Sequence, residues 1–150
     1  PRDLHASPPR RSSGRRGAGD VVPEHTLGSY EAALSWGAKA LEISVVQPKD
    51  RVLICQHDLT FDRTTTLTGV AAETDSSRLA AGRVAVPRLG PRWLGAGAPR
   101  IALLADVLDR LGHRAGLCIE AKDSAAYHAV VALLTQQGLT EYAVTKLPST

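Results

Sequence analysis

The strongest constraint on the fold of this chain is a repeated change between strand-like and helix-like segments. Apolar and polar residues alternate over 40–47, which predicts a strand because successive side chains of a strand face opposite sides. Thr26 and Ser124 are expected to cap the amino-terminal ends of two helices. Alternation of this kind favours a parallel α/β sheet. The expected strands are 40–47, 51–58, 115–122 and 142–145, and the expected helices are 27–36, 101–111 and 124–137.

The composition excludes several classes of protein. Hydrophobic residues make up 43% and charged residues 22%, which are values of a globular chain. No apolar run approaches the ~20 residues of a membrane-spanning helix. Two cysteines are too few for a disulfide scaffold, and their spacing favours buried thiols over a structural zinc site. The first residues lack the apolar core of a secretory signal, so a cytoplasmic location is predicted.

The net charge of +3 is concentrated near the amino terminus. Residues 1–16 hold five arginines against one aspartate, whereas the rest of the chain is close to neutral. Residues 1–15 are therefore expected to form a flexible basic tail, and residues 16–150 a single domain. Nucleic-acid binding is not expected, because it would need a basic folded surface. The sequence makes no prediction of oligomeric state.

Polar residues interrupt the expected strands near their carboxyl ends, where active sites collect in parallel α/β folds. Glu42 and Glu120 each stand between apolar neighbours. They could face solvent, or they could converge on a cation such as Mg²⁺ or Ca²⁺, which prefers oxygen ligands. Residues two apart share a strand face, which groups Glu42 with Ser44, Cys55 with His57, and Cys118 with Glu120 and Lys122.

Three further features have both a structural and a functional interpretation. His57 followed by Asp58 could be a simple turn or part of a catalytic site. Lys122 could pair with Glu120 or hold an anion. The glycine-rich turn that begins at Arg16 could approach a phosphate closely. A Walker A loop and a GxGxxG dinucleotide fingerprint are both absent.

Together these motifs resemble the glycerophosphodiester phosphodiesterase family, in its amino-terminal portion. The family pattern is His-Arg-Gly, Pro-Glu-Asn-Thr, Glu-x-Asp, His-Asp with Leu-Asp-Arg-Thr-Thr, and Glu-x-Lys. The matching segments are RRGAGDVVPEHT (15–26), ALEISVVQPKDRVLICQHDLTFDRTTTLTG (40–69) and LCIEAK (117–122).

The resemblance implies a TIM-type (β/α) barrel and metal-dependent hydrolysis of a small glycerophosphodiester to glycerol 3-phosphate and an alcohol. It implies a divalent cation, Mg²⁺ or Ca²⁺, and two histidines that act as general acid and base. Carried over to this chain, His57 is the second catalytic histidine, and Arg16 and Lys122 contact the phosphate. The implied metal ligands are Glu42, Glu120 and Glu24.

The chain departs from the family pattern at three positions. Arg15 stands where the family has its first catalytic histidine, and a guanidinium stays protonated and cannot act as a base. Ser44 stands where the family has a metal-binding aspartate. His25 replaces the asparagine after Glu24 and could bind metal or replace the lost imidazole. We therefore expect impaired catalysis.

The chain length also departs from the pattern. A full barrel has eight strands and about 250 residues. About five strands fit into this chain, so an incomplete barrel is expected, and no strand is expected before Arg15. Two alternative functions follow: a non-catalytic relative that binds phosphate or a cation, and a barrel with sphingomyelinase D-like phosphodiester chemistry.

Overall fold

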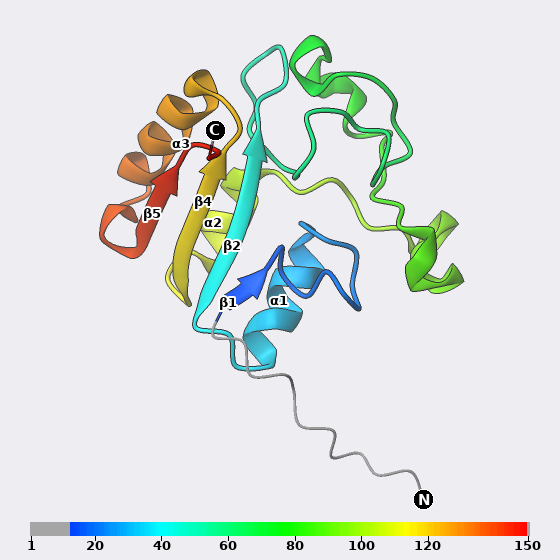
Figure 1. Ribbon diagram of the computed structural model, residues 1–150, viewed down its shortest axis with the longest axis horizontal. Coiled ribbons are helices and arrows are strands. Elements are labelled where there is room, and N and C mark those ends of the chain that lie inside the picture. The colour runs from blue at the N-terminus through cyan, green and yellow to red at the C-terminus, as the bar shows by residue number, and fades with distance from the viewer. Residues whose placement is uncertain (1–12, 150) are drawn as a thin grey trace, which may run out of the picture.

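A computed structural model of the chain describes residues 13–149. The protein is an α/β fold built on an open sheet, in which β1, β2, β4 and β5 lie side by side in that order and run parallel (Figure 1). The short strand β3 pairs with β2 in the antiparallel direction. The strands are β1 (Ser13–Arg15), β2 (Ala40–Val46), β3 (Ile54–Cys55), β4 (Gly116–Ala121) and β5 (Ala143–Lys146), and the helices are α1 (Leu27–Ser35), α2 (Leu104–Leu111) and α3 (Ser124–Gln136).

The parallel α/β sheet is confirmed, but two expectations about its strands are wrong. The expected strand over 51–58 shrinks to β3, because β2 returns through a tight turn in which the Arg51 amide donates to the Pro48 carbonyl. So short a connection allows only antiparallel pairing. A strand, β1, also precedes Arg16, and Ser13 and Gly14 in it are not strand formers. Residues 1–12, the larger part of the expected tail, lie outside the described residues.

Side-chain caps mark the start of α1 and α3, whereas α2 begins without one. Thr26 caps α1 as expected, because its hydroxyl accepts from the Ser29 amide while the Ser29 hydroxyl accepts from the Thr26 amide. The expected cap of α3 is wrong by one residue. The carboxylate of Asp123, and not Ser124, accepts a hydrogen bond from the Ala126 amide at 2.8 Å. Helix α2 begins at Leu104, three residues later than expected.

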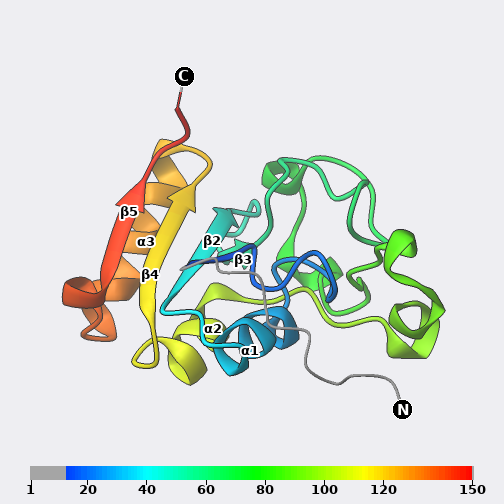
Figure 2. The same ribbon diagram turned by 60° about the horizontal axis from the view of Figure 1, so that its bottom comes forward.

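All three helices cover the same face of the sheet (Figures 1 and 2). The buried positions of β4 alternate, so that Leu117, Ile119 and Ala121 pack on this side. The opposite face carries the polar positions and has no helix over it within residues 13–149. The main core is therefore formed by the helices and one side of the sheet, with Tyr30, Leu41, Ile43, Leu104, Leu108 and Leu134 among its members.

Residues 56–103 form a long excursion between β3 and α2, shown in green in Figure 1. It contains short 3₁₀ turns, such as Ser76–Arg78, and isolated β-bridges, but no α-helix or extended strand. A second hydrophobic cluster stabilises it, with Phe61 fully buried at its centre. In residues 13–149, none of the helices has the length and apolar character needed to cross a bilayer.

Candidate active site

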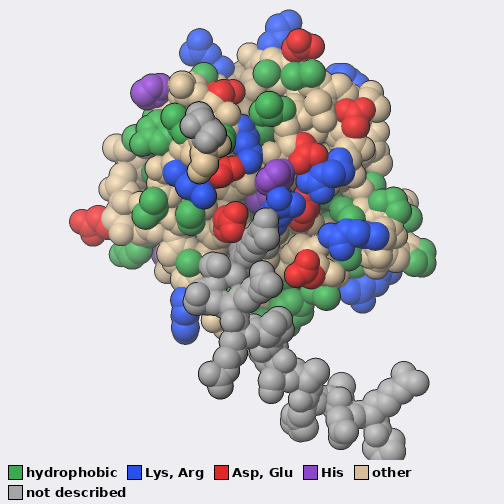
Figure 3. Space-filling view, in the orientation of Figure 1, with side chains coloured by type: hydrophobic (Ala, Val, Ile, Leu, Met, Phe, Trp, Pro, Cys, Tyr) green, Lys and Arg blue, Asp and Glu red, His purple; other side chains and the backbone are tan. Residues whose placement is uncertain are grey.

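The residues of the predicted site come from the carboxyl ends of the strands and the turns that follow them. Arg16 comes directly after β1, His57 lies two residues after β3, and Lys122 comes directly after β4. Glu24 lies in the turn that leads into α1. Basic, acidic and imidazole side chains gather at the centre of one face of the molecule (Figure 3). The sheet therefore brings together residues that are far apart in the sequence.

The turn after β1 depends on glycine. Arg16 and Gly17 both have positive φ angles, 52° and 72°. A Cβ atom at Gly17 would lie 2.3 Å from the Ser29 Oγ and 2.7 Å from the Ser29 carbonyl carbon, so only glycine fits against α1 there. The Ala18 amide donates to the Ser29 carbonyl at 3.0 Å, and the His25 amide donates to the Arg16 carbonyl at 3.0 Å. These contacts fix the backbone that presents Arg16.

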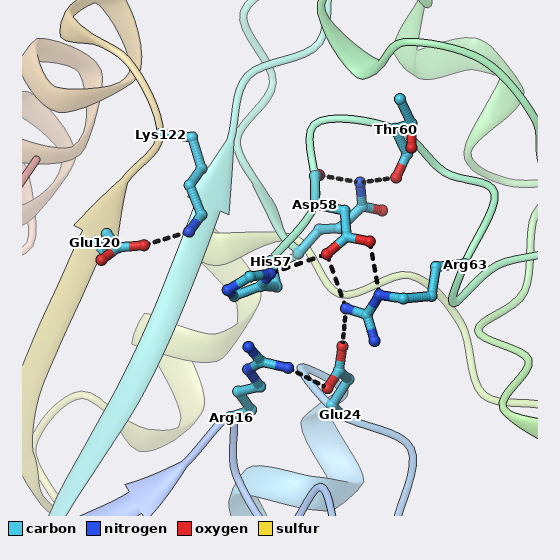
Figure 4. Close-up of polar contacts among 9 residues, drawn as sticks. Arg16, Glu24, His57, Asp58, Thr60, Arg63, Glu120 and Lys122 are labelled. Carbon is cyan, nitrogen blue, oxygen red and sulfur yellow. Dashed lines mark hydrogen bonds and ion pairs between the residues drawn. The ribbon is translucent and has the colours of Figure 1, made fainter. Parts of the chain in front are cut away.

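A continuous chain of ion pairs links Arg16 to His57 (Figure 4). Glu24 accepts from Arg16 Nη1 at 3.1 Å and from Arg63 Nη2 at 2.6 Å. Arg63 also binds the carboxylate of Asp58 with two nitrogens, at 2.6 and 2.8 Å. Asp58 Oδ1 lies 2.9 Å from Nδ1 of His57. We call these five residues, Arg16, Glu24, Arg63, Asp58 and His57, the charge ladder.

The ladder keeps its carboxylates ionised. The Arg63 hydrogen bonds hold the pKa of Asp58 well below its usual range, and His57 adds to that effect. Burial alone would raise the pKa of Glu24, but Arg63 and Arg16 outweigh burial and lower it overall. The pKa of Arg63 is raised, chiefly by its bond to Asp58. Arg16, Glu24, Arg63 and Asp58 thus form a row of alternating charges that ends at the His57 ring.

Lys122 contacts Glu120, which is one of the two interpretations that the sequence left open. Their head groups form an ion pair, and Lys146 Nζ approaches the other oxygen of Glu120 at 3.6 Å. The Lys122 hydrogen bond is the main cause of the lowered pKa of Glu120, with Lys146 adding to it. Glu120 is therefore occupied by two ammonium groups.

Within residues 13–149 the expected metal ligands do not gather into one cluster of carboxylates. The strand register pairs Ser44 with Glu120, so Glu42, Ser44 and Glu120 share the helix-free face as expected. However, residues 13–149 contain no group of three or more His, Cys, Asp or Glu side chains placed to hold one ion. Glu24 is engaged by two arginines and Glu120 by two lysines. Position 44 offers a neutral hydroxyl in place of a carboxylate. The residues present therefore do not fit a cation site built from three carboxylates.

Replacing Ser44 with aspartate should create cation affinity. The new carboxylate would lie in register with Glu120 and on the same face as Glu42, and we expect Ca²⁺ or Mg²⁺ to bind about tenfold more tightly or better. Isothermal titration of the wild type, Ser44→Asp and the neutral control Ser44→Asn measures this. Because the cation would bind only the folded state, it should also raise the melting temperature of Ser44→Asp and leave that of the two other proteins unchanged. Equal affinities in all three proteins would contradict the assignment of position 44.

His25 lies in the core, so neither of its two expected roles is supported. Its side chain is 2% exposed, and Nδ1 is 2.6 Å from the hydroxyl of Tyr30. Burial is the main cause that lowers the pKa of His25 to about 3, so the ring is neutral. Its φ angle of 56° explains why a residue tolerant of the left-handed region stands there. His25 packs beneath the site as a structural residue.

The predicted pairing of Cys55 with His57 on one strand face is wrong, because β3 ends at Cys55. Cys55 belongs to the main core, and burial raises the pKa of its thiol to about 12. The ring of His57 is 38% exposed. Both cysteines are free thiols, and Cys118 is half-buried. The prediction of a buried thiol is therefore confirmed for Cys55 and wrong for Cys118.

Two members of the charge ladder were assigned no role by the sequence. Asp58 was read as part of a turn or of the His-Asp motif, and Arg63 only as part of the threonine-rich segment. The sequence did contain one signal for this ion pair: Asp58 and Arg63 have opposite charges and stand five residues apart in one loop. The backbone of Arg15 in β1 pairs with that of Glu42 in β2. The side chain of Arg15 lies outside the described part of the structure.

An open parallel sheet with cationic and imidazole groups at its carboxyl ends defines an α/β protein suited to phosphate chemistry. The model of the glycerophosphoryl diester phosphodiesterase family matches residues 16–140. The chain therefore belongs to the glycerophosphoryl diester phosphodiesterase family. The family assignment made from the motifs is confirmed.

Individual relatives agree with this assignment. The glycerophosphodiester phosphodiesterase of Bacillus subtilis is 38% identical over 119 residues, which are 75% of this chain and 40% of that protein. The crystal structure of glycerophosphodiester phosphodiesterase from Agrobacterium tumefaciens has a TM-score of 0.81 at 31% identity, over 91% of this chain and 57% of that one. An Oleispira antarctica phosphodiesterase, solved with the product sn-glycerol-3-phosphate, has a TM-score of 0.76 at 24% identity, over 90% of this chain and 56% of that one. The chain thus spans about half the length of these relatives.

Proposed function

We propose that this chain carries the phosphate-binding and proton-transferring side of a site that hydrolyses glycerophosphodiesters to glycerol 3-phosphate and an alcohol. The observation that carries the proposal is the position of the His57 ring, which lies between Arg16 and Lys122 and is fixed by Asp58 (Figure 4). Two cations beside one imidazole are what phosphodiester cleavage needs, because negative charge builds up on the phosphoryl oxygens while a proton moves.

In this proposal each residue has one task. Arg16 and Lys122 hold the phosphoryl oxygens, and Glu24 and Glu120 hold these two cations in place. His57 moves a proton at Nε2, because Nδ1 is engaged by Asp58. As the family resemblance implies, the glycerol hydroxyl next to the phosphate attacks phosphorus and gives its proton to His57. The alcohol leaves with a proton from His57, and water then opens the cyclic phosphate to glycerol 3-phosphate.

We further propose that turnover is impaired. Arg15 cannot accept a proton at the position of the family's first histidine, so one imidazole must serve where the family has two. A divalent cation, Mg²⁺ or Ca²⁺, would meet Glu42, Glu120 and the hydroxyl of Ser44, and we expect it to bind weakly there. These two departures also support the second candidate function, a non-catalytic relative that binds phosphate.

The fold supports a further proposal, that the four parallel strands β1, β2, β4 and β5 are an arc of a (β/α) barrel, one strand fewer than the sequence suggested. The helices lie on one face and the polar residues on the other, as in a barrel whose interior is the helix-free face. The structural match to the Agrobacterium enzyme covers 57% of that chain, in line with a partial barrel.

Release of glycerol 3-phosphate from glycerophosphocholine tests the proposed function. We expect the 150-residue chain to release the product slowly, and to respond weakly to Mg²⁺, Ca²⁺ or a chelator. In parallel, glycerol 3-phosphate should raise the melting temperature, because it binds the folded state. Stabilisation without release would favour the phosphate-binding relative. Neither release nor stabilisation would contradict both candidate functions.

A further inference from the structure

We propose that Arg63 is a positioning residue, which fixes the His57 ring through Asp58 and the Arg16 guanidinium through Glu24. No step of the proposed reaction requires Arg63 to touch substrate. The consequence for catalysis rests on the proposed function, whereas the consequence for the His57 ring does not.

Arg63 joins the two carboxylates of the charge ladder with one planar group. Nε and Nη2 donate to the two oxygens of Asp58 at 2.6 and 2.8 Å, and Nη2 also donates to Glu24 Oε1 at 2.6 Å. A guanidinium offers five donors in a fixed fork, so one side chain can hold both carboxylates at once. Lysine at this position would keep the charge but would lose the two-point contact.

The contact fixes which nitrogen of His57 carries the proton. An ionised carboxylate only accepts hydrogen bonds, and two bonds from Arg63 keep Asp58 ionised. Nδ1 of His57, 2.9 Å from Asp58 Oδ1, must therefore donate. The proton sits on Nδ1, and Nε2 keeps its lone pair available for proton transfer.

Asp58 alone would hold the ring less well. His57 and Asp58 are neighbours in the sequence, and their side chains are 38% and 26% exposed. Without the fork of Arg63, the carboxylate could rotate about its own bonds and hydrogen-bond to water instead. Arg63 thus stabilises the one rotamer in which Oδ1 faces the ring.

The same guanidinium also serves the other end of the ladder. Glu24 is a 7% exposed carboxylate that contacts Arg16 and Arg63. Loss of Arg63 would leave a buried carboxylate with one cation in place of two, and Glu24 and Arg16 would then shift together. A single residue of the 56–103 excursion thereby connects the turn after β1 to the segment that follows β3.

Nitrogen NMR of ¹⁵N-histidine-labelled protein tests the proposal without any need for turnover. At about pH 8 the imidazole is neutral in the ordinary case, and the nitrogen shifts distinguish a proton on Nδ1 from one on Nε2. We expect His57 of the wild type to be in the Nδ1–H form. Arg63→Lys and Asp58→Asn should each turn this form into a mixture of both.

Two comparisons keep the result interpretable. Arg114→Lys is the matched control, since Arg114 makes an exposed ion pair with Glu31 and should leave the His57 signals unchanged. Asp58→Asn keeps the shape of the side chain and removes its charge, and it provides a second test if Arg63→Lys unfolds. An Nε2–H form in the wild type, or an unchanged Nδ1–H form in the folded variants, would overturn the proposal. Absence of glycerol 3-phosphate release with the expected tautomer change would contradict the proposed function alone.

Discussion

Replacing His57 with alanine is expected to lower the rate of glycerol 3-phosphate release by ~10²–10⁴-fold, the usual effect of removing a general acid–base group. The expectation follows from the ring's place between Arg16 and Lys122 and from the absence of an imidazole at position 15. The phosphate-binding cations stay in this variant, so glycerol 3-phosphate should still raise its melting temperature. The measurement is a discontinuous product assay on matched protein concentrations.

The control for this prediction is His128→Ala. His128 is exposed on α3, away from the site, and its loss should not change the rate. If His57→Ala releases product as fast as the wild type does, another group performs the proton transfer, and the role of His57 is wrong. If only the wild type and His128→Ala release glycerol 3-phosphate, the imidazole of His57 performs the proton transfer.

Acid should weaken the fold through His25, and the variant His25→Asn should resist that effect. The folded-state pKa of His25 is about 3, because the ring is buried. Imidazole in the unfolded chain has a pKa near 6.5, so below about pH 6.5 the unfolded state binds a proton that the folded state excludes. The contribution of His25 to stability is complete above that pH and falls until about pH 3, by on the order of 5 kcal/mol.

Urea unfolding of both proteins at several pH values between 7 and 4 measures the difference. Asparagine does not titrate and tolerates the positive φ angle of position 25. His25→Asn should start about 1 kcal/mol less stable at pH 7, because the Tyr30 hydroxyl loses its partner, and should then fall more slowly. Protonation of Glu24 and Asp58 also lowers the stability of the protein below about pH 4, and it does so in both proteins. Parallel curves above pH 4 would show that His25 does not control acid sensitivity.

Elements that depend only on their own residues and near neighbours were predicted correctly from the sequence. In β2 and β4 the alternation of apolar and polar residues is decisive, because one face must pack on the helices. The capping of α1 by Thr26 was predictable for the same local reason. The grouping of Glu42, Ser44 and Glu120 on one face followed from counting by two along each strand.

Features that depend on partners far away in the sequence were missed. Strand β1 is held by hydrogen bonds to β2, and Ser13 and Gly14 carry no apolar signal of their own. The pattern over 51–58 predicted a full strand, but only two of its residues pair with β2. The short connection from β2 makes this pairing antiparallel. The role of Arg63 depends on Glu24, which is distant in sequence and becomes a neighbour only in the folded chain.

Strand β2 pairs with β1, β3 and β4, and these three strands lead to Arg16, His57 and Lys122. Its pairing with β4 joins positions separated by the whole 56–103 excursion. Closing so long a loop is entropically costly and tends to slow folding. We therefore expect the site to assemble late in folding, once β2 has gained its neighbours on both sides. A substitution that loosens β2 would change the kinetics of maturation as well as the final stability.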